Sequence, residues 1–375
     1  MEDKINKKKY LLYIDIVILA IVIFFVASIG INKLIVKNEM KNADHAIISN
    51  KNVHMYSSAK EGKKFDALEM GANAYILKTV EDKNGAEWKK IKVGDKVGYV
   101  KSENISKYNP QYKKKDIMID VSKFNMQNTF NNVGEFKAFV INNNIKFVYI
   151  RAGGRGYGKA GNFYTDPKAD DYAQACEFLN IPFGYYFLDE AITTEEVNQE
   201  VDFINEYLDK HRYSNNILPV AIDVEKHAET GRADKIWDIR YKYVDELIKK
   251  IESNGRRALL YSNANIANKY LYNVDSAMWL AYYPEVTSIP DYWYSDTKGD
   301  GALNKVLISK LVGWQFTENG VKDTMDKKID ISIVYSKYFI EDDTTDIKND
   351  MKESNEKVFG PINNMINTIL QNKGT

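Results

Sequence analysis

The sequence predicts a mixed α/β chain in which a parallel sheet or barrel follows one apolar helix and a small all-β unit. Three observations support this organisation. Residues 11–31 are almost uniformly apolar, residues 46–106 form short segments broken by turn residues, and residues 116–340 alternate apolar runs with amphipathic helices. These patterns are typical of a membrane span, a small β-barrel and repeated βα units, respectively.

Charge and composition exclude several classes of function. The chain carries 52 basic and 52 acidic side chains, so its net charge is zero and no global field recruits nucleic acid. Cys176 is the single cysteine, and the four histidines have no metal-ligand spacing. Residues 156–161 match a dinucleotide-binding fingerprint, but no helix is predicted to follow them. The sequence therefore predicts neither a metal nor another cofactor.

The amino terminus predicts a membrane anchor. Lysines cluster in residues 1–10, ahead of the apolar run at 11–31. That run is about 21 residues long and as a helix would span roughly 30 Å, the hydrocarbon thickness of a bilayer. The positive-inside rule places residues 1–10 in the cytoplasm and everything after the span outside it. We expect a single-pass protein of a bacterial cell membrane with the domains after the span extracytoplasmic; the alternative is secretion after cleavage of a signal peptide.

Residues 46–106 predict a small all-β domain. Alternating segments at 52–56, 74–80, 87–92 and 96–100 are separated by turn residues. Gly71 precedes the second segment, and Trp88 is followed by Val97-Gly-Tyr-Val100. This arrangement resembles a bacterial SH3 domain, a family whose members usually contact cell-wall peptide. A role as a spacer stays open, because binding has to be argued from a site.

Residues 116–340 predict the catalytic part of the chain, between a linker at 107–115 and a charged tail at 341–375 that can hold a short helix. Thr193 and Glu196 form a capping box that begins one helix, and Asn254-Gly255 ends another. Parallel barrels place functional residues at the carboxyl ends of their strands, so acids and aromatic residues there are site candidates. Strands are expected at 117–121, 147–151, 182–187, 218–223, 258–262, 278–281 and 311–315.

Asp223 and Glu225 end the apolar run 217–222 and form a candidate catalytic pair. Residues i and i+2 of a strand project to the same face, so the two carboxyls should lie together. Glycoside hydrolysis needs one acid to protonate the leaving oxygen and one carboxylate to stabilise or attack the developing cation. Roughly seven acid-x-acid pairs are expected by chance at this composition, so the pair needs supporting context.

The context is a series of motifs in a consistent order across residues 116–340. They are Asp120-Val-Ser122, Phe147-Val-Tyr-Ile-Arg-Ala-Gly153, Asp166-Pro167, Gly184-Tyr-Tyr-Phe187, Pro219-Val-Ala-Ile-Asp-Val-Glu225, Leu260-Tyr-Ser262, Trp279-Leu-Ala-Tyr-Tyr283, Gly313-Trp-Gln-Phe-Thr317 and Ile329-Asp330. Together they resemble glycoside hydrolase family 25, the Chalaropsis-type lysozymes. The resemblance implies an irregular TIM-like β/α barrel and hydrolysis of the β-1,4 bond between N-acetylmuramic acid and N-acetylglucosamine in peptidoglycan.

The resemblance also implies the site residues. It makes Glu225 the general acid and base, and Asp223 the acid that orients the substrate's 2-acetamido group or stabilises charge. Glu225 is expected to keep its proton near neutral pH, because burial and adjacent acids disfavour another charge. Asp120 and Asp330 are implied as further acids of the cleft. The candidate substrate-binding residues are Tyr186, Trp279, Trp314, Tyr283 and Arg151.

Two site residues carry open questions. Arg151 could instead be the partner in a structural ion pair that makes no contact with the substrate. Phe187 departs from the Tyr-His-Phe pattern common in the family, which removes one polar contact from the expected site.

Three functions stay open on this basis. The first is a membrane-anchored muramidase that acts locally on the cell wall, with peptidoglycan strands and the cytoplasmic membrane as partners and an envelope-spanning assembly as a further candidate. The second is an inactive wall-binding scaffold, and the third is a chitinase-like hydrolase of another glycan. No nucleic-acid partner is expected. Retention or inversion is not predicted, because it depends on the separation of the carboxyls.

Overall fold

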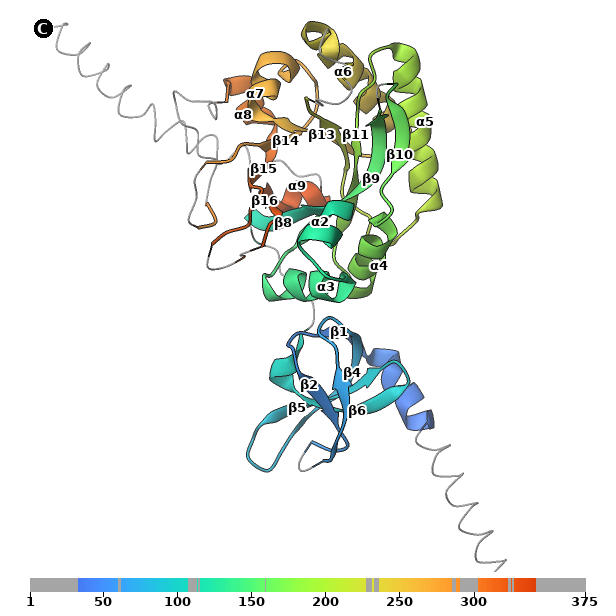
Figure 1. Cartoon of the computed structure of the whole chain (residues 1–375), viewed down its shortest axis with the longest axis vertical. Helices are drawn as coiled ribbons and strands as arrows, with labels where there is room; N and C mark the ends of the chain where they lie inside the picture. Colours follow the sequence, from blue (N-terminus) through green and yellow to red (C-terminus); the bar gives the residue numbers. More distant parts are fainter. Residues whose placement is uncertain are drawn as a thin grey trace, which may run out of the picture. The chain divides into compact units, whose positions relative to one another are not determined.

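The protein is seen here as a computed structural model, which describes residues 33–59, 62–106, 113, 115–158, 160–226, 231–232, 236–284, 288–290, 303–322, 325 and 327–341. The chain divides into two compact units, Met1–Lys107 and Tyr108–Thr375 (Figure 1). In the described ranges no helix is long and apolar enough to cross a membrane. The predicted span at 11–31 and the charged tail after residue 341 lie outside those ranges.

The first unit is an antiparallel sheet around one apolar core. Its seven described strands have the order β3-β2-β6-β5-β4-β1-β7. Ala46, Ile48, Met55 and Ile91 are fully buried in the core. The elements are Met40–Asn42 (3₁₀), β1 Asp44–Ile48, β2 Val53–Tyr56, β3 Lys64–Leu68, β4 Asn73–Glu81, β5 Glu87–Val93, β6 Lys96–Lys101, Ser102–Asn104 (3₁₀) and β7 Ile105–Ser106.

The second unit is mixed α/β and is built around an eight-strand barrel. Over the described residues its sheet has the order β10-β9-β11-β12-β13-β14-β15-β16-β8, and β8 also pairs with β9, which closes the barrel and leaves β10 as an outer strand. The strands are β8 Lys115–Val121, β9 Phe147–Tyr157, β10 Asn162–Thr165, β11 Phe183–Leu188, β12 Val220–Val224, β13 Ala258–Asn263, β14 Met278–Ala281, β15 Leu311–Thr317 and β16 Asp330–Tyr335.

The last strand of the barrel runs against the others. Neighbours from β8 through β9 and β11 to β15 are parallel, whereas β16 pairs antiparallel with both β15 and β8. The first residue of β16, Asp330, therefore lies at the rim where the other strands end, directly opposite Asp120 of β8. This strand was not among the seven predicted, because it follows β15 through a loop and not through a helix as βα alternation requires.

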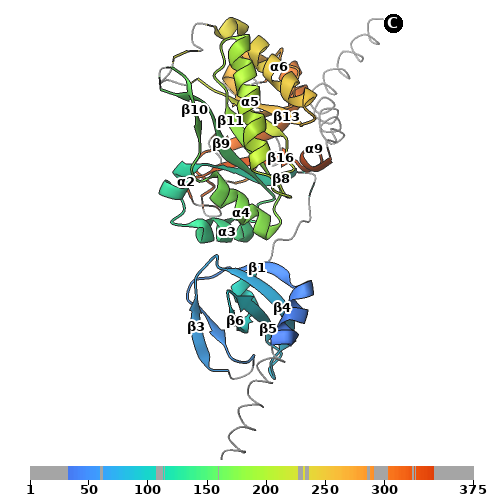
Figure 2. The ribbon, with the colours of Figure 1, turned by 90° about the vertical axis from the view of Figure 1, so that its right-hand side faces the viewer.

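Helices cover the outside of the barrel, and Figure 2 shows α5 in front of β11 and beside α6. Thr193 caps α5 as predicted, since its Oγ1 accepts the Glu196 N–H at 3.2 Å. The Glu196 carboxylate accepts the N–H of Ile192, so the predicted box lacks its reciprocal bond. The helices are α2 Lys123–Asn128, α3 Val133–Asn142, α4 Ala169–Leu179, α5 Thr194–Lys210, α6 Trp237–Ser253, α7 Ala264–Ile266, a π-turn Ala267–Leu271, α8 Lys305–Lys310 and α9 Ser336–Glu341.

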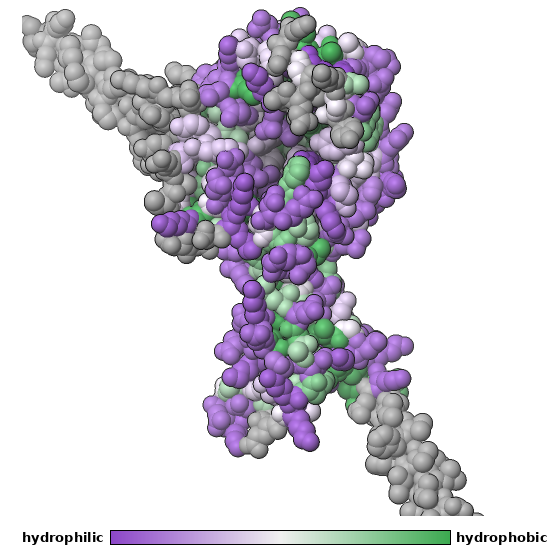
Figure 3. Space-filling model, viewed as in Figure 1, coloured by the Kyte–Doolittle hydropathy of each residue, from purple (hydrophilic) through white to green (hydrophobic). Residues whose placement is uncertain are grey.

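Aromatic side chains fill the interior of the barrel below the rim. Tyr149 and Trp279 are at most 2% exposed and stack with their ring centroids 5.0 Å apart. Phe147 and Phe339 are fully buried in the same core. Hydrophilic side chains cover most of the face of this unit that Figure 3 shows. The apolar floor leaves the rim as the place where polar groups can gather inside the barrel.

Candidate active site

A cavity of about 460 Å³ opens at the rim of the barrel. Its walls come from strand ends at the rim, the adjoining loops and helix α2. Barrels of this kind hold their chemistry at the carboxyl ends of the strands. The structure brings together eight of the nine site residues predicted from the sequence. They are Asp120, Arg151, Tyr186, Asp223, Glu225, Trp279, Tyr283 and Asp330.

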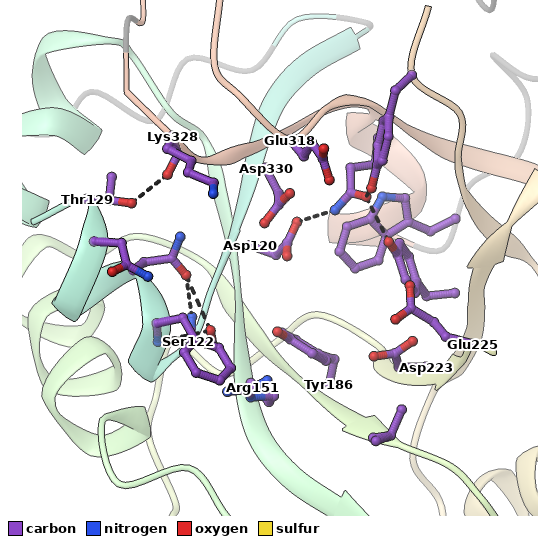
Figure 4. A pocket seen from close by; sticks show the side chains of 18 of the residues that line it. Asp120, Ser122, Thr129, Arg151, Tyr186, Asp223, Glu225, Glu318, Lys328 and Asp330 are labelled. Carbon is purple, nitrogen blue, oxygen red and sulfur yellow. Dashed lines mark hydrogen bonds between the residues drawn. The ribbon is translucent and has the colours of Figure 1, made fainter. Parts of the chain in front are cut away.

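The four acids occupy two facing walls. Asp120 and Asp330 are cross-strand partners of β8 and β16, whereas Asp223 belongs to β12 and Glu225 follows its end. Figure 4 shows the two pairs facing each other across the cavity, with the hydroxyl of Tyr186 pointing into the space between them. The arrangement concentrates ionisable oxygens around a space large enough for sugar units, which is a requirement for glycosidic chemistry.

Burial raises the pKa values of three of these carboxyls. It raises the pKa of Asp120 to about 7, with the charge of Glu225 adding to the effect and a hydrogen bond from Gln315 opposing it. It raises the pKa of Asp330 to about 9, with Asp120 adding to the effect. The pKa of Asp223 lies well above its usual value, first through burial and then through the charge of Glu225. Asp330 is therefore a neutral acid at pH 7, and Asp223 holds its proton more tightly than an ordinary aspartate does.

Glu225 is not buried, contrary to the expectation from the sequence. β12 ends at Val224, so Glu225 lies one residue beyond the strand and its side chain is exposed in the cavity. The buried member of the pair is Asp223, which is 7% exposed. Strand alternation predicted that the two carboxyls share a cavity, but it could not predict that the strand stops between them. The exposed acid is the one that a substrate can reach.

The backbone of Asp223 is hydrogen-bonded to a residue of a buried ion pair. The N–H of Asp189 donates to the Asp223 carbonyl at 2.9 Å, and Arg240 Nη2 donates to Asp189 Oδ2 at 2.8 Å. The side chains of that pair are 1% and 2% exposed. Oδ1 of Asp223 is buried and has no hydrogen-bond partner within the described residues. A ligand N–H or O–H would satisfy this oxygen.

Arg151 makes the structural ion pair considered for it, and it also lines the cavity. It lines the cavity, and its Nε donates to Asp166 Oδ2 at 3.0 Å. Its guanidinium lies over the ring of Phe124, 5.0 Å from the centroid. Asp166 also accepts the backbone N–H groups of Lys123 and Lys168, each at 2.9 Å. Arg151 is therefore a wall residue whose charge is already neutralised by an ion pair.

Trp314 does not line the cavity, and its predicted contact with substrate is wrong. A Cβ atom on Gly313 would point at Trp279 inside the barrel, so period-two alternation turns Trp314 outward. Its Nε1 donates to the Tyr282 carbonyl at 2.8 Å, and its ring borders a small outer cavity. Trp279, in contrast, forms part of the floor of the site, with Nε1 donating to Ser332 Oγ at 2.9 Å.

Sequence reasoning missed a glutamine at the centre of the site. Oε1 of Gln315 accepts the hydroxyls of Tyr261 and Tyr283 at 2.7 and 2.5 Å, and its Nε2 donates to Asp120 Oδ2 at 2.7 Å. Both Tyr261 and Gln315 lie at the carboxyl ends of predicted strands, a signal that could have identified them. The other lining residues missed are Ser122, Phe124, Asn125, Asn128, Thr129, Tyr164, Leu188, Glu318 and Lys328.

The described part of the chain contains no group of three or more His, Cys, Asp or Glu side chains arranged to hold a metal ion.

Comparison with known proteins identifies a family. The model described as Glycosyl hydrolases family 25 matches residues 119–325, more than half of the chain. The matched region contains Asp120, Asp223 and Glu225. Asp330 lies beyond it, so the place of Asp330 in the site rests on the barrel geometry. No curated protein matches the chain.

Several solved structures are distantly similar. The spore cortex lytic enzyme SleM of Clostridium perfringens is 20% identical, with a TM-score of 0.43 over 60% of this chain and 69% of that chain. The catalytic domain of endolysin ply40 from bacteriophage P40 of Listeria monocytogenes is 15% identical, with a TM-score of 0.44 over 64% and 99%. The modular autolysin LytC from Streptococcus pneumoniae is 17% identical, with a TM-score of 0.45 over 77% and 58%. The family assignment rests on the match to the family model.

The raised pKa of Asp330 predicts a pH-dependent gain in stability for Asp330→Asn. The folded chain holds this proton up to a pH of about 9, whereas the ordinary value is 3.8, so the contribution of Asp330 to stability falls as pH rises between those values. Asparagine has no proton to lose. The variant should gain at least about 1 kcal/mol at pH 8 relative to its effect at pH 4, since one pKa unit corresponds to about 1.4 kcal/mol.

The measurement is urea unfolding at both pH values. The control is Asp202→Asn, an exposed acid on α5, which should change stability little at either pH. A gain for Asp330→Asn that is equal at pH 4 and pH 8 would contradict the assignment.

Proposed function

The chain belongs to family 25 of the glycosyl hydrolases and is a peptidoglycan-cleaving glycoside hydrolase, and we propose that Glu225 and Asp223 carry its cleavage of the β-1,4 bond between N-acetylmuramic acid and N-acetylglucosamine. One observation carries the assignment of the residues. Two acids separated by one residue reach the same cavity, one exposed to a ligand and the other buried with a raised pKa.

Glu225 is the proton donor in this proposal. Its exposed carboxyl can reach the glycosidic oxygen, to which it gives its proton as the bond from that oxygen to the sugar C1 breaks. The resulting carboxylate then takes a proton from the water that completes hydrolysis. Asp223 orients the neighbouring sugar, because its unsatisfied Oδ1 can accept the N–H of a 2-acetamido group. Asp120 faces the same space and stabilises positive charge that develops at C1 when it is ionised.

The polar walls also suit a neutral, donor-rich ligand. Tyr186 and Tyr283 present hydroxyls at the cavity, and Trp279 lies at its floor. Aromatic rings stack on the apolar faces of sugars, while hydroxyl and carboxyl oxygens bind the sugar O–H and N–H groups.

We predict that Glu225→Gln abolishes hydrolysis with the fold intact. Loss of a general acid typically costs 10²–10⁴-fold in rate, because the leaving oxygen then departs unprotonated. The measurement is release of muramic acid reducing ends from purified peptidoglycan by the full chain, with circular dichroism as a check on folding.

The matched control is Glu206→Gln, the same exchange at an exposed position on α5 outside the cavity, which should keep full activity. Turnover by Glu225→Gln at the wild-type rate would remove Glu225 from this role. Wild-type cleavage of chitin alone would identify another glycan as the substrate, and no cleavage of either polymer would favour an inactive scaffold.

We also propose that residues 11–31 anchor the enzyme in the cytoplasmic membrane, with the catalytic domain outside. The support is the apolar run and the lysines before it. In a bacterial host the full chain should remain in the membrane fraction after washing with salt and alkali, whereas a chain that begins at residue 33 should not. Amino-terminal sequencing checks the alternative, since a mature chain that starts after the apolar run would indicate a cleaved signal peptide.

We further propose that the first unit is a bacterial SH3-like module that contacts wall peptide. The support is its small antiparallel sheet, in which Tyr56 of β2 packs edge-on against Trp88 of β5 at 5.4 Å between centroids. Full-length Glu225→Gln should then bind intact peptidoglycan more tightly than glycan strands stripped of peptide. Equal binding to both in a sedimentation assay would assign the unit a spacer role.

A further inference from the structure

Gln315 lies at the centre of a hydrogen-bond network inside the catalytic barrel. It belongs to β15, is 2% exposed, and is held by pairing with β14 on one side and β16 on the other. Its carbonyl also accepts the N–H of Tyr282 at 3.1 Å. The side chain therefore reaches its three partners from a rigid backbone position, and those partners lie on or next to strands β13, β14 and β8.

The contacts of Gln315 determine which way its amide faces. Tyr261 Oη and Tyr283 Oη both lie at Oε1, at 2.7 and 2.5 Å, and a tyrosine hydroxyl has a proton to donate there. Nε2 has only protons to donate, and it faces Asp120 Oδ2 at 2.7 Å. Rotation of the amide by half a turn would place two oxygens against each other at Asp120 and lose the acceptor for both tyrosines.

We propose that Gln315 is a positioning residue for hydrolysis, which selects Asp120 as the charged member of the Asp120–Asp330 pair and turns the oxygens of Tyr261 and Tyr283 into acceptors for the substrate. This inference deepens the proposed function and rests on it. The network uses the single proton of each tyrosine, so only lone pairs remain to face the cavity. Sugar O–H and N–H groups are donors of the matching kind.

The selection of Asp120 follows from an asymmetry between two facing acids. Asp120 and Asp330 are directly opposed across β8 and β16, and two adjacent carboxyls disfavour double ionisation. Only Asp120 receives the Gln315 N–H, a bond that stabilises its charged form. The pKa values agree with this order, at about 7 for Asp120 and about 9 for Asp330.

Other groups also act on the two carboxyls. Arg151 of β9, which is paired with Asp166, favours the charged form of Asp120. Glu318 disfavours the charged form of Asp330, and Glu225 disfavours the charged form of both. Besides Asp120, the titratable residues that line the cavity are Arg151, Tyr164, Tyr186, Asp223, Glu225, Tyr261, Tyr283, Glu318, Lys328 and Asp330.

Gln315→Glu tests the donor directly. Glutamate keeps the shape and the acceptor for both tyrosines but places a second acid against Asp120. The pH profile of kcat/KM should have an inflection near pH 7, and in the variant this inflection should shift to a pH at least one unit higher. Activity is measured as the release of reducing ends from peptidoglycan. A purely structural role would lower activity by the same factor at every pH, and an unmoved inflection overturns the inference. Gln174→Glu, the same exchange at an exposed site on α4, should leave the profile unchanged.

Tyr283→Phe keeps the inference testable if the glutamate variant does not fold, because this side chain is 43% exposed. Loss of one acceptor should raise KM about 3–10-fold, as expected for one hydrogen bond. The inflection of the pH profile near pH 7 should stay where it is in the wild type. An unchanged KM overturns the acceptor role. Failure of the wild-type chain to release muramic acid ends would refute the proposed function itself, a result distinct from failure of either variant to change as stated.

Discussion

The antiparallel pairing of β16 with β8 is the constraint on which the site depends. A barrel of parallel strands alone would bring only carboxyl ends to the catalytic rim. Because β16 runs the other way, its first residue arrives there instead, and Asp330 lies opposite Asp120. Together with the pairing of β8 and β9, it completes the closed ring of strands. The topology of the barrel therefore places the two acids together.

Crowding of acids over an aromatic floor explains the electrostatics of the cavity. Stacked rings such as Tyr149 and Trp279 keep water from the base of the site, and buried carboxyls in such a place keep their protons. Asp223 is one of them, whereas Glu225 leaves the strand and meets solvent. The site thus places a buried acid with a raised pKa beside an exposed acid that a substrate can reach.

Much of this arrangement could be predicted from the sequence, because strand periodicity and barrel topology are local rules. The apolar runs located seven barrel strands, and motif order located the acids. Local rules failed where tertiary structure decides. Trp314 looked like a sugar contact, but alternation from Gly313 turns it outward. The strand of Asp330 was missed because it breaks βα alternation, although the acid itself belonged to a predicted motif.

Gln315 shows the limit of such reasoning most clearly. Its importance arises from three partners that lie far away in the sequence, and no spacing rule links Asp120 to a residue near the end of the barrel. The burial that raises the pKa values of the acids is likewise a property of the closed barrel. A sequence pattern can identify which residues reach the rim, but it cannot determine which of them will be charged.

The most direct test of this account is a carbon-13 NMR titration of the aspartate and glutamate side-chain carboxyls in the intact chain, assigned by single substitutions. The account predicts that Asp120 titrates with a midpoint near 7 and Asp330 near 9, while Asp223 stays protonated well above the ordinary range for aspartate. Midpoints close to 4 for all three carboxyls would contradict it, because the cavity would then be neither buried nor crowded enough to separate a neutral acid from a charged one.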